Sequence, residues 1–295
     1  MMGAHDLAAD LAARFGLDKR PRSWGGDCPA CSYPRAFSVR VGKGNRPMLF
    51  CANGCTREAL DKVARNAVGL VWTPPTRPDD TTVERRRAGR QAAALRLWAG
   101  STPCAGTAAA LYLAARGIGH ALTSDALRYR GDCSHPEGGR LPAMVAGVLD
   151  VAGQPIAAHR TYLTPGGAKA GADPAKASLG PVWGGAVRLD PVAPELVIGE
   201  GIETAASAGL LLGLPAWAAI NAGNLARGLL LPPEVRAVVI AADPDPVGRD
   251  AAAAASTRWQ SEGRRVRIAT PDQPGRDFND VLQDRARRAA EGSYG

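Results

Sequence analysis

Two groups of residues in this sequence have the chemistry of metal ligands. The first is a set of four thiols near the amino end: Cys28, Cys31, Cys51 and Cys55. The second is a set of three carboxylates toward the carboxyl end: Glu200, Asp243 and Asp245. Thiolates are typical ligands of structural zinc, whereas carboxylates hold magnesium. On a basic chain, the two groups together indicate phosphoryl or nucleotidyl transfer on nucleic acid.

The cysteines form two close pairs, Cys28-Pro-Ala-Cys31 and Cys51-Ala-Asn-Gly-Cys55, separated by nineteen residues. Two such pairs on tight turns can surround one zinc ion as a tetrahedron, and four protein ligands make the site structural rather than catalytic. The alternatives are four buried free cysteines or two disulfides. A reducing cytoplasm, which we expect for this chain, favours metal ligands over disulfides. Cys104 and Cys133 are expected to be free thiols.

The three acidic residues follow two runs of apolar residues that are expected to be buried strands. Glu200 comes after Leu196-Val-Ile198, and Asp243-Pro-Asp245 comes after Val238-Val-Ile-Ala-Ala242. In extended backbone, side chains two residues apart point to the same side. Three oxygen ligands that converge in this way suit one or two Mg²⁺ ions, which also bind substrate phosphates. The alternative is helix capping, because acidic residues are common where a strand leads into a helix.

Charge and hydropathy restrict the class of protein. The chain has 295 residues, 45% of them hydrophobic, and a formal net charge of +8. Most of the positive charge is arginine, which binds phosphates through a planar fork, so a polyanionic partner is expected. A GC-rich genome is the alternative explanation of the arginine bias. No segment is apolar enough to predict a membrane span or a signal peptide, so we expect a cytoplasmic protein without a membrane partner.

The amino-terminal half is expected to contain a zinc-binding domain, a linker and a basic region. Residues 1–72 would form the zinc unit, with a helix at 4–15, ribbon strands at 36–41 and 47–50, and a helix that Thr56 caps. Residues 73–87 are rich in proline and polar residues and predict a linker. Residues 88–193 would form a mixed helical and strand-rich region. Its expected elements are a helix over 84–116, a hairpin of 144–151 with 155–163, a loop at 164–180 and a strand at 186–189.

Residues 194–288 alternate between strand and helix patterns, which predicts an α/β domain with a parallel sheet and flanking helices. Strands are expected at 196–198, 216–220, 237–241 and 266–269, and helices at 202–212 and 248–261. Ligands of such sheets bind at the carboxyl ends of the strands. Glu200 and Asp243 lie at two of these ends, so the expected fold and the expected chemistry agree.

Two other nucleotide-binding motifs are not supported. Gly199-Glu-Gly201 follows a strand, but the third glycine of the dinucleotide-binding fingerprint is replaced by Thr204. The sequence contains no G-x-x-x-x-G-K-[ST], so a P-loop motor is not expected.

Three segments resemble the Toprim domain of bacterial-type primases, topoisomerases and some nucleases: Val197-Ile-Gly-Glu-Gly-Ile-Glu-Thr204, Val239-Ile-Ala-Ala-Asp-Pro-Asp-Pro-Val-Gly248 and Gly275-Arg-Asp-Phe-Asn-Asp-Val-Leu282. The cysteine region is similar to the zinc-binding domain of bacterial, phage and plasmid primases. The resemblance implies that Glu200, Asp243 and Asp245 form the acidic metal site, with Asp277 nearby. The family's second Asp-x-Asp appears here as Asp277-Phe-Asn279, followed by Asp280.

The resemblance further implies a DNA primase, a nucleotidyltransferase that makes short RNA primers on single-stranded DNA in phage or plasmid replication. Zinc would be structural and Mg²⁺ or Mn²⁺ catalytic. Nucleoside triphosphates would be substrates, bound through Arg160 or Lys176, with Lys169 in the same basic region, and a replicative helicase would act in trans. Five residues of the zinc unit could contact the template: Arg35, Arg40, Arg46, Phe37 and Phe50. For the aromatic residues, packing within the ribbon is the alternative. Two other functions stay open, a Toprim-type metal-dependent nuclease and a non-catalytic replication accessory protein.

Overall fold

The computed structural model describes residues 4–42, 46–69, 80–273 and 275–292. The chain divides into two compact units, Met1–Val83 with Pro136–Gly139, and Glu84–His135 with Arg140–Gly295. The division falls inside the predicted linker 73–87, of which residues 73–79 lie outside the described ranges. In the described ranges, no helix has both the length and the apolar character needed to cross a bilayer.

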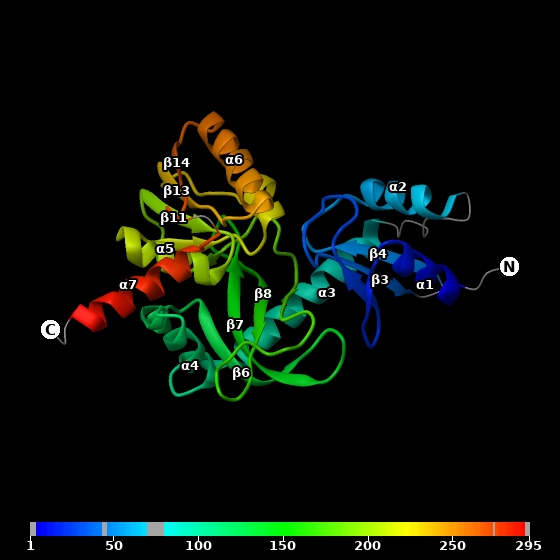
Figure 1. Cartoon of the computed structure of the whole chain (residues 1–295), viewed down its shortest axis with the longest axis horizontal. Coiled ribbons are helices and arrows are strands. Elements are labelled where there is room, and N and C mark those ends of the chain that lie inside the picture. The colour runs from blue at the N-terminus through cyan, green and yellow to red at the C-terminus, as the bar shows by residue number, and fades with distance from the viewer. Residues whose placement is uncertain (1–3, 43–45, 70–79, 274, 293–295) are drawn as a thin grey trace. The chain divides into compact units, whose positions relative to one another are not determined.

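In its described residues, the first unit contains helices α1 and α2 and a small antiparallel sheet (Figure 1). Its elements are α1 (Ala4–Arg14), β1 (Asp18–Lys19), β2 (Trp24–Gly26), β3 (Phe37–Val41), β4 (Pro47–Cys51) and α2 (Arg57–Val68), with the strands in sequential order. Its core contains Leu11, Phe37 and Leu60. Thr56 caps α2 by accepting a hydrogen bond from the Ala59 amide at 3.2 Å, which confirms the predicted cap.

The single helix expected over 84–116 is wrong. Helix α3 (Asp80–Ala99) and helix α4 (Ala108–Ala115) are separated by β5 (Thr102–Pro103), and residues 80–87 are helical rather than part of a linker. The break contains Gly106 at φ +71°, a conformation that favours glycine. Thr107 then caps α4 by accepting a hydrogen bond from the Ala109 amide.

The second unit contains an antiparallel sheet with the order β5-β6-β7-β8-β9. Its other strands are β6 (Leu127–Ser134), β7 (Arg140–Leu149), β8 (Pro155–Tyr162) and β9 (Lys176–Leu179). The predicted hairpin is confirmed as β7 and β8, but β9 lies within the segment that was expected to be a loop. Side chains along β7 and β8 alternate between the two faces of this sheet. On one face, Val145 and Ala158 pack with Ala94 of α3. On the other face, Met144 and Ala157 join the core shared with the carboxyl-terminal sheet.

The carboxyl-terminal sheet has the order β10-β12-β11-β13-β14, and its four parallel strands with flanking helices confirm the expected fold, whereas one antiparallel edge strand makes it a mixed sheet. Its strands are β10 (Val187–Arg188), β11 (Glu195–Gly199), β12 (Ala216–Ala218), β13 (Ala237–Ala241) and β14 (Arg265–Ala269), and only β10 runs antiparallel. Helices α5 (Ile202–Leu212) and α7 (Phe278–Gly292) lie on one side of the strands and α6 (Pro246–Ser261) on the other (Figure 1). The strands and helices predicted from alternation are therefore present.

Candidate functional site

The four predicted zinc ligands lie together in the first unit. The sulfurs of Cys28 and Cys55 are 3.8 Å apart, as are those of Cys31 and Cys51, and all four lie within 4.8 Å of one another. Four thiolates at about 2.3 Å from a zinc ion in a tetrahedron would be about 3.8 Å apart. The spacing therefore fits zinc, and it does not fit disulfides, whose sulfurs are bonded at about 2 Å.

Neighbouring residues shape this cysteine site. Gly54 adopts φ +81°, so the turn between Cys51 and Cys55 requires a residue without a Cβ. The side-chain amide of Asn53 donates to the sulfur of Cys31 at 3.6 Å. A hydrogen bond of this kind orients a thiolate ligand and stabilises its charge.

Two aromatic residues proposed for template contact have different environments. Phe37 is fully buried and meets Phe15 edge to face, with ring centroids 5.7 Å apart, so it packs the ribbon. Phe50 is 59% exposed. The three arginines proposed with them, Arg35, Arg40 and Arg46, are also exposed.

The acidic residues of the second unit lie at the carboxyl edge of the mixed sheet. Strands β11 and β13 are adjacent and parallel, with Gly199 opposite Ala241, so Glu200 and Asp243 follow neighbouring strand ends. The carbonyl of Glu200 accepts a hydrogen bond from the Ile220 amide at 2.8 Å. Ile220 has φ +78°, which is rare for a β-branched residue and is a kind of strain found at functional sites.

Asp243 is half-buried among other charged groups. Its Oδ1 accepts a hydrogen bond from the Thr204 hydroxyl at 3.0 Å, which links it to the first turn of α5. Burial raises the pKa of Asp243; the Thr204 hydrogen bond opposes that rise, and the nearby carboxylates of Asp245 and Asp277 add to it. Lys176 lowers the same pKa. These interactions bring the three predicted aspartates and one predicted lysine into one electrostatic cluster.

Asp245 also caps α6. Its Oδ1 accepts a hydrogen bond from the Gly248 amide at 2.7 Å, so the capping alternative holds for one of its oxygens. The side chain is exposed, and its second oxygen can still serve as a ligand. Cap and ligand roles are therefore compatible at this position.

Asp277 and Asp280 form a reciprocal cap at the start of α7. The amide of Asp280 donates to Asp277 Oδ1 at 2.7 Å, and the amide of Asp277 donates to Asp280 Oδ2 at 3.2 Å. Asn279, between them in sequence, is 1% exposed. Its amide nitrogen donates to the Arg116 carbonyl at 2.7 Å and to the Ser207 hydroxyl at 3.0 Å. Asn279 is thus a packing residue that joins α7 to α5 and to the end of α4.

Glu203, which is buried on α5, was not among the predicted site residues. Its Oε2 lies 2.9 Å from Lys176 Nζ, and its Oε1 accepts a short hydrogen bond from the Tyr112 hydroxyl. Burial alone would raise the pKa of Glu203, but Lys176 and Tyr112 outweigh it and hold that pKa well below its usual range. The signal was present in the segment Gly199–Thr204, where only the first glutamate was considered.

Lys176 and Arg160, both predicted to hold phosphates, lie on opposite faces of the middle sheet. Lys176 pairs with Thr161 across β8 and β9, whereas Arg160 pairs with Ala177. Paired residues share a face and consecutive residues alternate. Arg160 is buried and donates to the Ala177 carbonyl at 3.2 Å and the Ser134 carbonyl at 3.0 Å. Only Lys176 is therefore directed toward the acidic cluster.

Lys169 is a second lysine near this cluster. Lys169 is exposed, but partial desolvation and the nearby Lys176 lower its pKa, whereas Glu203 and Asp277 raise it. The loop before β9 thus contributes positive charge beside the acidic edge.

Among the described residues, the four cysteines form the only group of three or more His, Cys, Asp or Glu side chains that could hold one metal ion. Their ligand atoms lie within 4.8 Å of one another. Glu200, Asp243 and Asp245 do not form such a group. Mg²⁺ usually takes one or two protein carboxylates and completes its octahedron with water and phosphate oxygens, so it does not require three of them close together.

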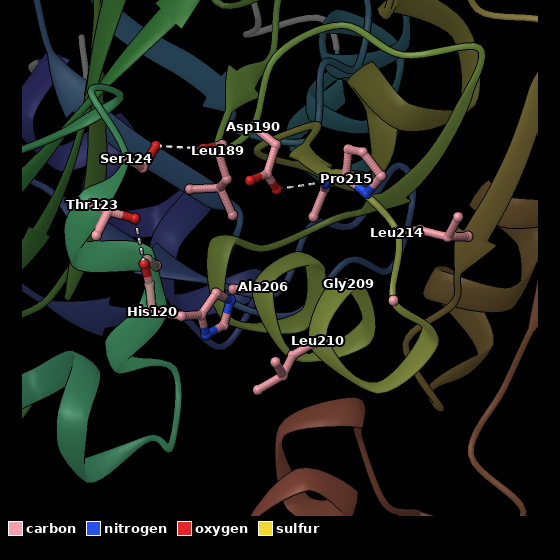
Figure 2. A pocket seen from close by; sticks show the side chains of 13 residues that line it. His120, Thr123, Ser124, Leu189, Asp190, Ala206, Gly209, Leu210, Leu214 and Pro215 are labelled. Carbon is pink, nitrogen blue, oxygen red and sulfur yellow. Dashed lines mark hydrogen bonds between the residues drawn. The ribbon is translucent and has the colours of Figure 1, made fainter.

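A cavity of about 270 Å³ lies at the other end of the sheet (Figure 2). It is lined by His120, Asp190 and mostly apolar residues around Ala216, where β12 begins. The Asp190 carboxylate accepts a hydrogen bond from the Ala216 amide at 2.9 Å, so this carboxylate has a structural partner. The cavity is at the amino ends of the parallel strands and is not part of the acidic edge.

Comparisons with protein families match two parts of the chain. Residues 195–288 match the Toprim domain, which confirms the domain expected there. Residues 88–189 match a domain of unknown function (DUF7146). No curated protein matches the chain.

Solved structures of primases have a similar fold. The zinc-binding and RNA polymerase domains of the Aquifex aeolicus primase are 15% identical, with a TM-score of 0.50 over 98% of this chain and 83% of that one. The primase fragment of the bacteriophage T7 primase-helicase is 14% identical, with a TM-score of 0.44 over 90% of this chain and 97% of that one. The DnaG primase catalytic domain bound to single-stranded DNA is 16% identical, with a TM-score of 0.48 over 71% of this chain and 81% of that one.

Proposed function

This chain carries a Toprim domain within a fold similar to that of zinc-binding primases, and from that premise we propose that it is a DNA primase. The reaction would be metal-dependent nucleotidyl transfer that makes short RNA primers on single-stranded DNA. The observation that carries the proposal is the acidic carboxyl edge, where Glu200 and Asp243 follow adjacent parallel strands and the Thr204 hydroxyl holds the Asp243 carboxylate at 3.0 Å.

Glu200, Asp243 and Asp245 are the proposed ligands of the catalytic Mg²⁺ or Mn²⁺, and Asp277 is an additional acidic residue beside them. Such metal ions lower the pKa of an attacking hydroxyl and stabilise charge on the attacked phosphate. Thr204 holds the Asp243 carboxylate through its hydroxyl, which fixes one ligand oxygen. The cap at Asp245 fixes another carboxylate at the start of α6.

The triphosphate of the incoming nucleotide is assigned to Lys176, with Lys169 beside it. Lys176 is 35% exposed, so its ammonium can contact a phosphate while Glu203 holds it in position. Arg160 supports this arrangement indirectly, because its guanidinium donates to backbone carbonyls of β9 (Ala177) and β6 (Ser134).

The zinc unit is proposed to bind the single-stranded template through exposed basic residues and Phe50. Zinc would stabilise this unit, since Cys28 and Cys51 are buried within its core. A replicative helicase acting in trans and a cytoplasmic location complete the proposal. A phage or plasmid replication system is the expected setting.

The proposal is tested by primer synthesis. Purified protein is incubated with single-stranded DNA, labelled ribonucleotides and Mg²⁺ or Mn²⁺, and products are resolved on a denaturing gel. Asp243→Asn should reduce product by at least about a hundredfold. Asp125→Asn is the matched control, because Asp125 is exposed and lies in the segment before β6, outside the acidic cluster.

Other results would contradict primer synthesis. Metal-dependent shortening of the DNA would favour a Toprim-type nuclease. DNA binding without either product, with the helicase supplied, would favour an accessory protein.

A further inference from the structure

Trp183 is a half-exposed aromatic residue beside the carboxyl edge of the mixed sheet. Its side chain is 50% exposed, and Leu230 nearby is 51% exposed. Strand β10 runs antiparallel to β12, with Val187 opposite Ala218, so the residues before β10 lie beside the carboxyl end of β12. That is the end from which Ile220 donates a hydrogen bond to Glu200.

One face of the indole lies against the backbone of Gly228. A Cβ added at Gly228 would be 2.8 Å from Trp183 Cδ2 and 2.9 Å from Cε2. These two atoms are shared by both rings, so an atom closest to them approaches the indole from its face. With one face covered by Gly228, the 50% exposure corresponds to an opposite face that is open to solvent.

Buried hydrogen bonds hold this aromatic residue in place. Asn224 is fully buried, and its Oδ1 accepts from the Gly184 amide at 2.9 Å. Its amide nitrogen donates to the carbonyls of Gly185 and Ala219 at 2.8 Å each. Asn224 thus ties the segment after Trp183 to the end of β12, because all three of its partners are main-chain groups.

The helical segment η3 (Asn224–Gly228), which supports the indole, is stabilised from α6. Arg258 donates to the carbonyls of Leu225, Ala226 and Leu229 at 2.9–3.3 Å. Arg227, the residue before Gly228, is exposed and adds positive charge beside the indole.

We propose that Trp183 is a stacking platform for a base of single-stranded DNA, with Arg227 near the adjoining phosphate. Proteins that bind single strands combine positive charge with aromatic faces on which bases stack. A fixed indole with one open face loses little conformational freedom on binding. This inference rests on the proposed function, because it names a contact of the template.

The test measures binding without nucleotides, so that it does not depend on primer synthesis. The zinc-loaded full chain is titrated with labelled oligothymidylate of about 15 nucleotides at fixed salt. Trp183→Leu should weaken binding about 5- to 150-fold, whereas Trp183→Phe, which keeps an aromatic face, should lose much less. An abasic oligonucleotide of equal length should bind wild type and Trp183→Leu equally.

A spectroscopic readout checks the stacking itself. Oligothymidylate should quench part of the tryptophan fluorescence of the wild type, and Trp183→Phe should remove that quenching while it still binds. Thermal unfolding establishes that both proteins are folded. Equal affinity of wild type and Trp183→Leu for oligothymidylate would then overturn the proposal. If the protein makes primers but its binding of DNA does not depend on Trp183, the proposed primase function stands and the stacking proposal fails. If binding depends on Trp183 but no primers are made, the stacking proposal stands and the primase function fails.

Discussion

Lys176 on β9 and Glu203 on α5 form an ion pair, with Nζ 2.9 Å from Oε2. The two residues lie in different domains of the chain. Lys176 lies in residues 88–189, which match the domain of unknown function, and Glu203 lies in residues 195–288, which match the Toprim domain. Tyr112 of α4 donates to the second oxygen of the same carboxylate. One buried carboxylate therefore joins the middle sheet, helix α4 and the Toprim domain, and it keeps a lysine beside the acidic edge.

Glu203→Gln should destabilise the protein by about 1–3 kcal/mol, because it leaves Lys176 without its counter-charge in a partly buried position. Urea unfolding of both proteins at pH 7 gives the difference. Glu262→Gln is the matched control, since Glu262 forms ion pairs with Arg258 and Arg264 at 37% exposure and should cost less than about 1 kcal/mol. Equal effects of the two substitutions would contradict a special role of Glu203.

The same carboxylate predicts a pH dependence of stability. The pKa of Glu203 in the folded chain lies below its ordinary value of 4.5, despite burial, because of Lys176 and Tyr112. As the pH falls, Glu203 is therefore protonated first in the unfolded state. The stability that its ion pair contributes is complete above the ordinary pKa of 4.5 and is progressively lost as the pH falls below that value. The difference in unfolding free energy between wild type and Glu203→Gln should be constant from about pH 7 to pH 5 and shrink toward pH 3. A difference that grows on acidification would rule out this account.

Two substitutions at Asp245 should separate its cap from its proposed metal role. Asparagine also caps helices, so Asp245→Asn should keep stability within a few tenths of a kcal/mol while primer synthesis is lost. Asp245→Ala removes both roles and should cost about 1 kcal/mol more. Thermal unfolding and the primer gel measure the two effects separately. Full activity of Asp245→Asn would remove this residue from the proposed ligand set.

Restoring the family's second Asp-x-Asp by Asn279→Asp should harm the protein. The amide nitrogen of Asn279 donates to the Arg116 carbonyl and the Ser207 hydroxyl in a buried site. A carboxylate there would face the carbonyl oxygen without a proton, at an expected cost of about 2–4 kcal/mol. Asp280→Asn, a change in the opposite direction at a partly exposed position, should cost less than about 1 kcal/mol. Urea unfolding of both variants decides whether position 279 tolerates a charge.

The sequence predicted what depends on local spacing. Alternation of apolar runs located β11, β13 and α5, and the position of Glu200 and Asp243 after two strands predicted that they share one edge. The paired cysteines predicted their cluster for the same reason, since two short turns dictate where the sulfurs lie.

Contacts between distant segments could not be predicted in this way. The face of β8 on which Arg160 lies depends on its register with β9, a strand hidden in a segment rich in glycine and alanine. The partners of Glu203 come from α4 and β9, and those of Asn279 from the end of α4 and the middle of α5. Each requires tertiary packing that no periodicity in one segment specifies.

Removal of one cysteine ligand should release zinc and unfold the first unit alone. Protein purified without chelator should contain one zinc per chain, and Cys51→Ser should contain much less, because Cys51 is a ligand as well as a core residue. Cys104→Ser and Cys133→Ser are matched controls, since both thiols are buried in the second unit and lie outside the cluster. Metal analysis gives the zinc content, and hydrogen exchange should show lost protection in residues 46–69 with protection kept in 195–269. Zinc-free wild-type protein would contradict the assignment of the four cysteines.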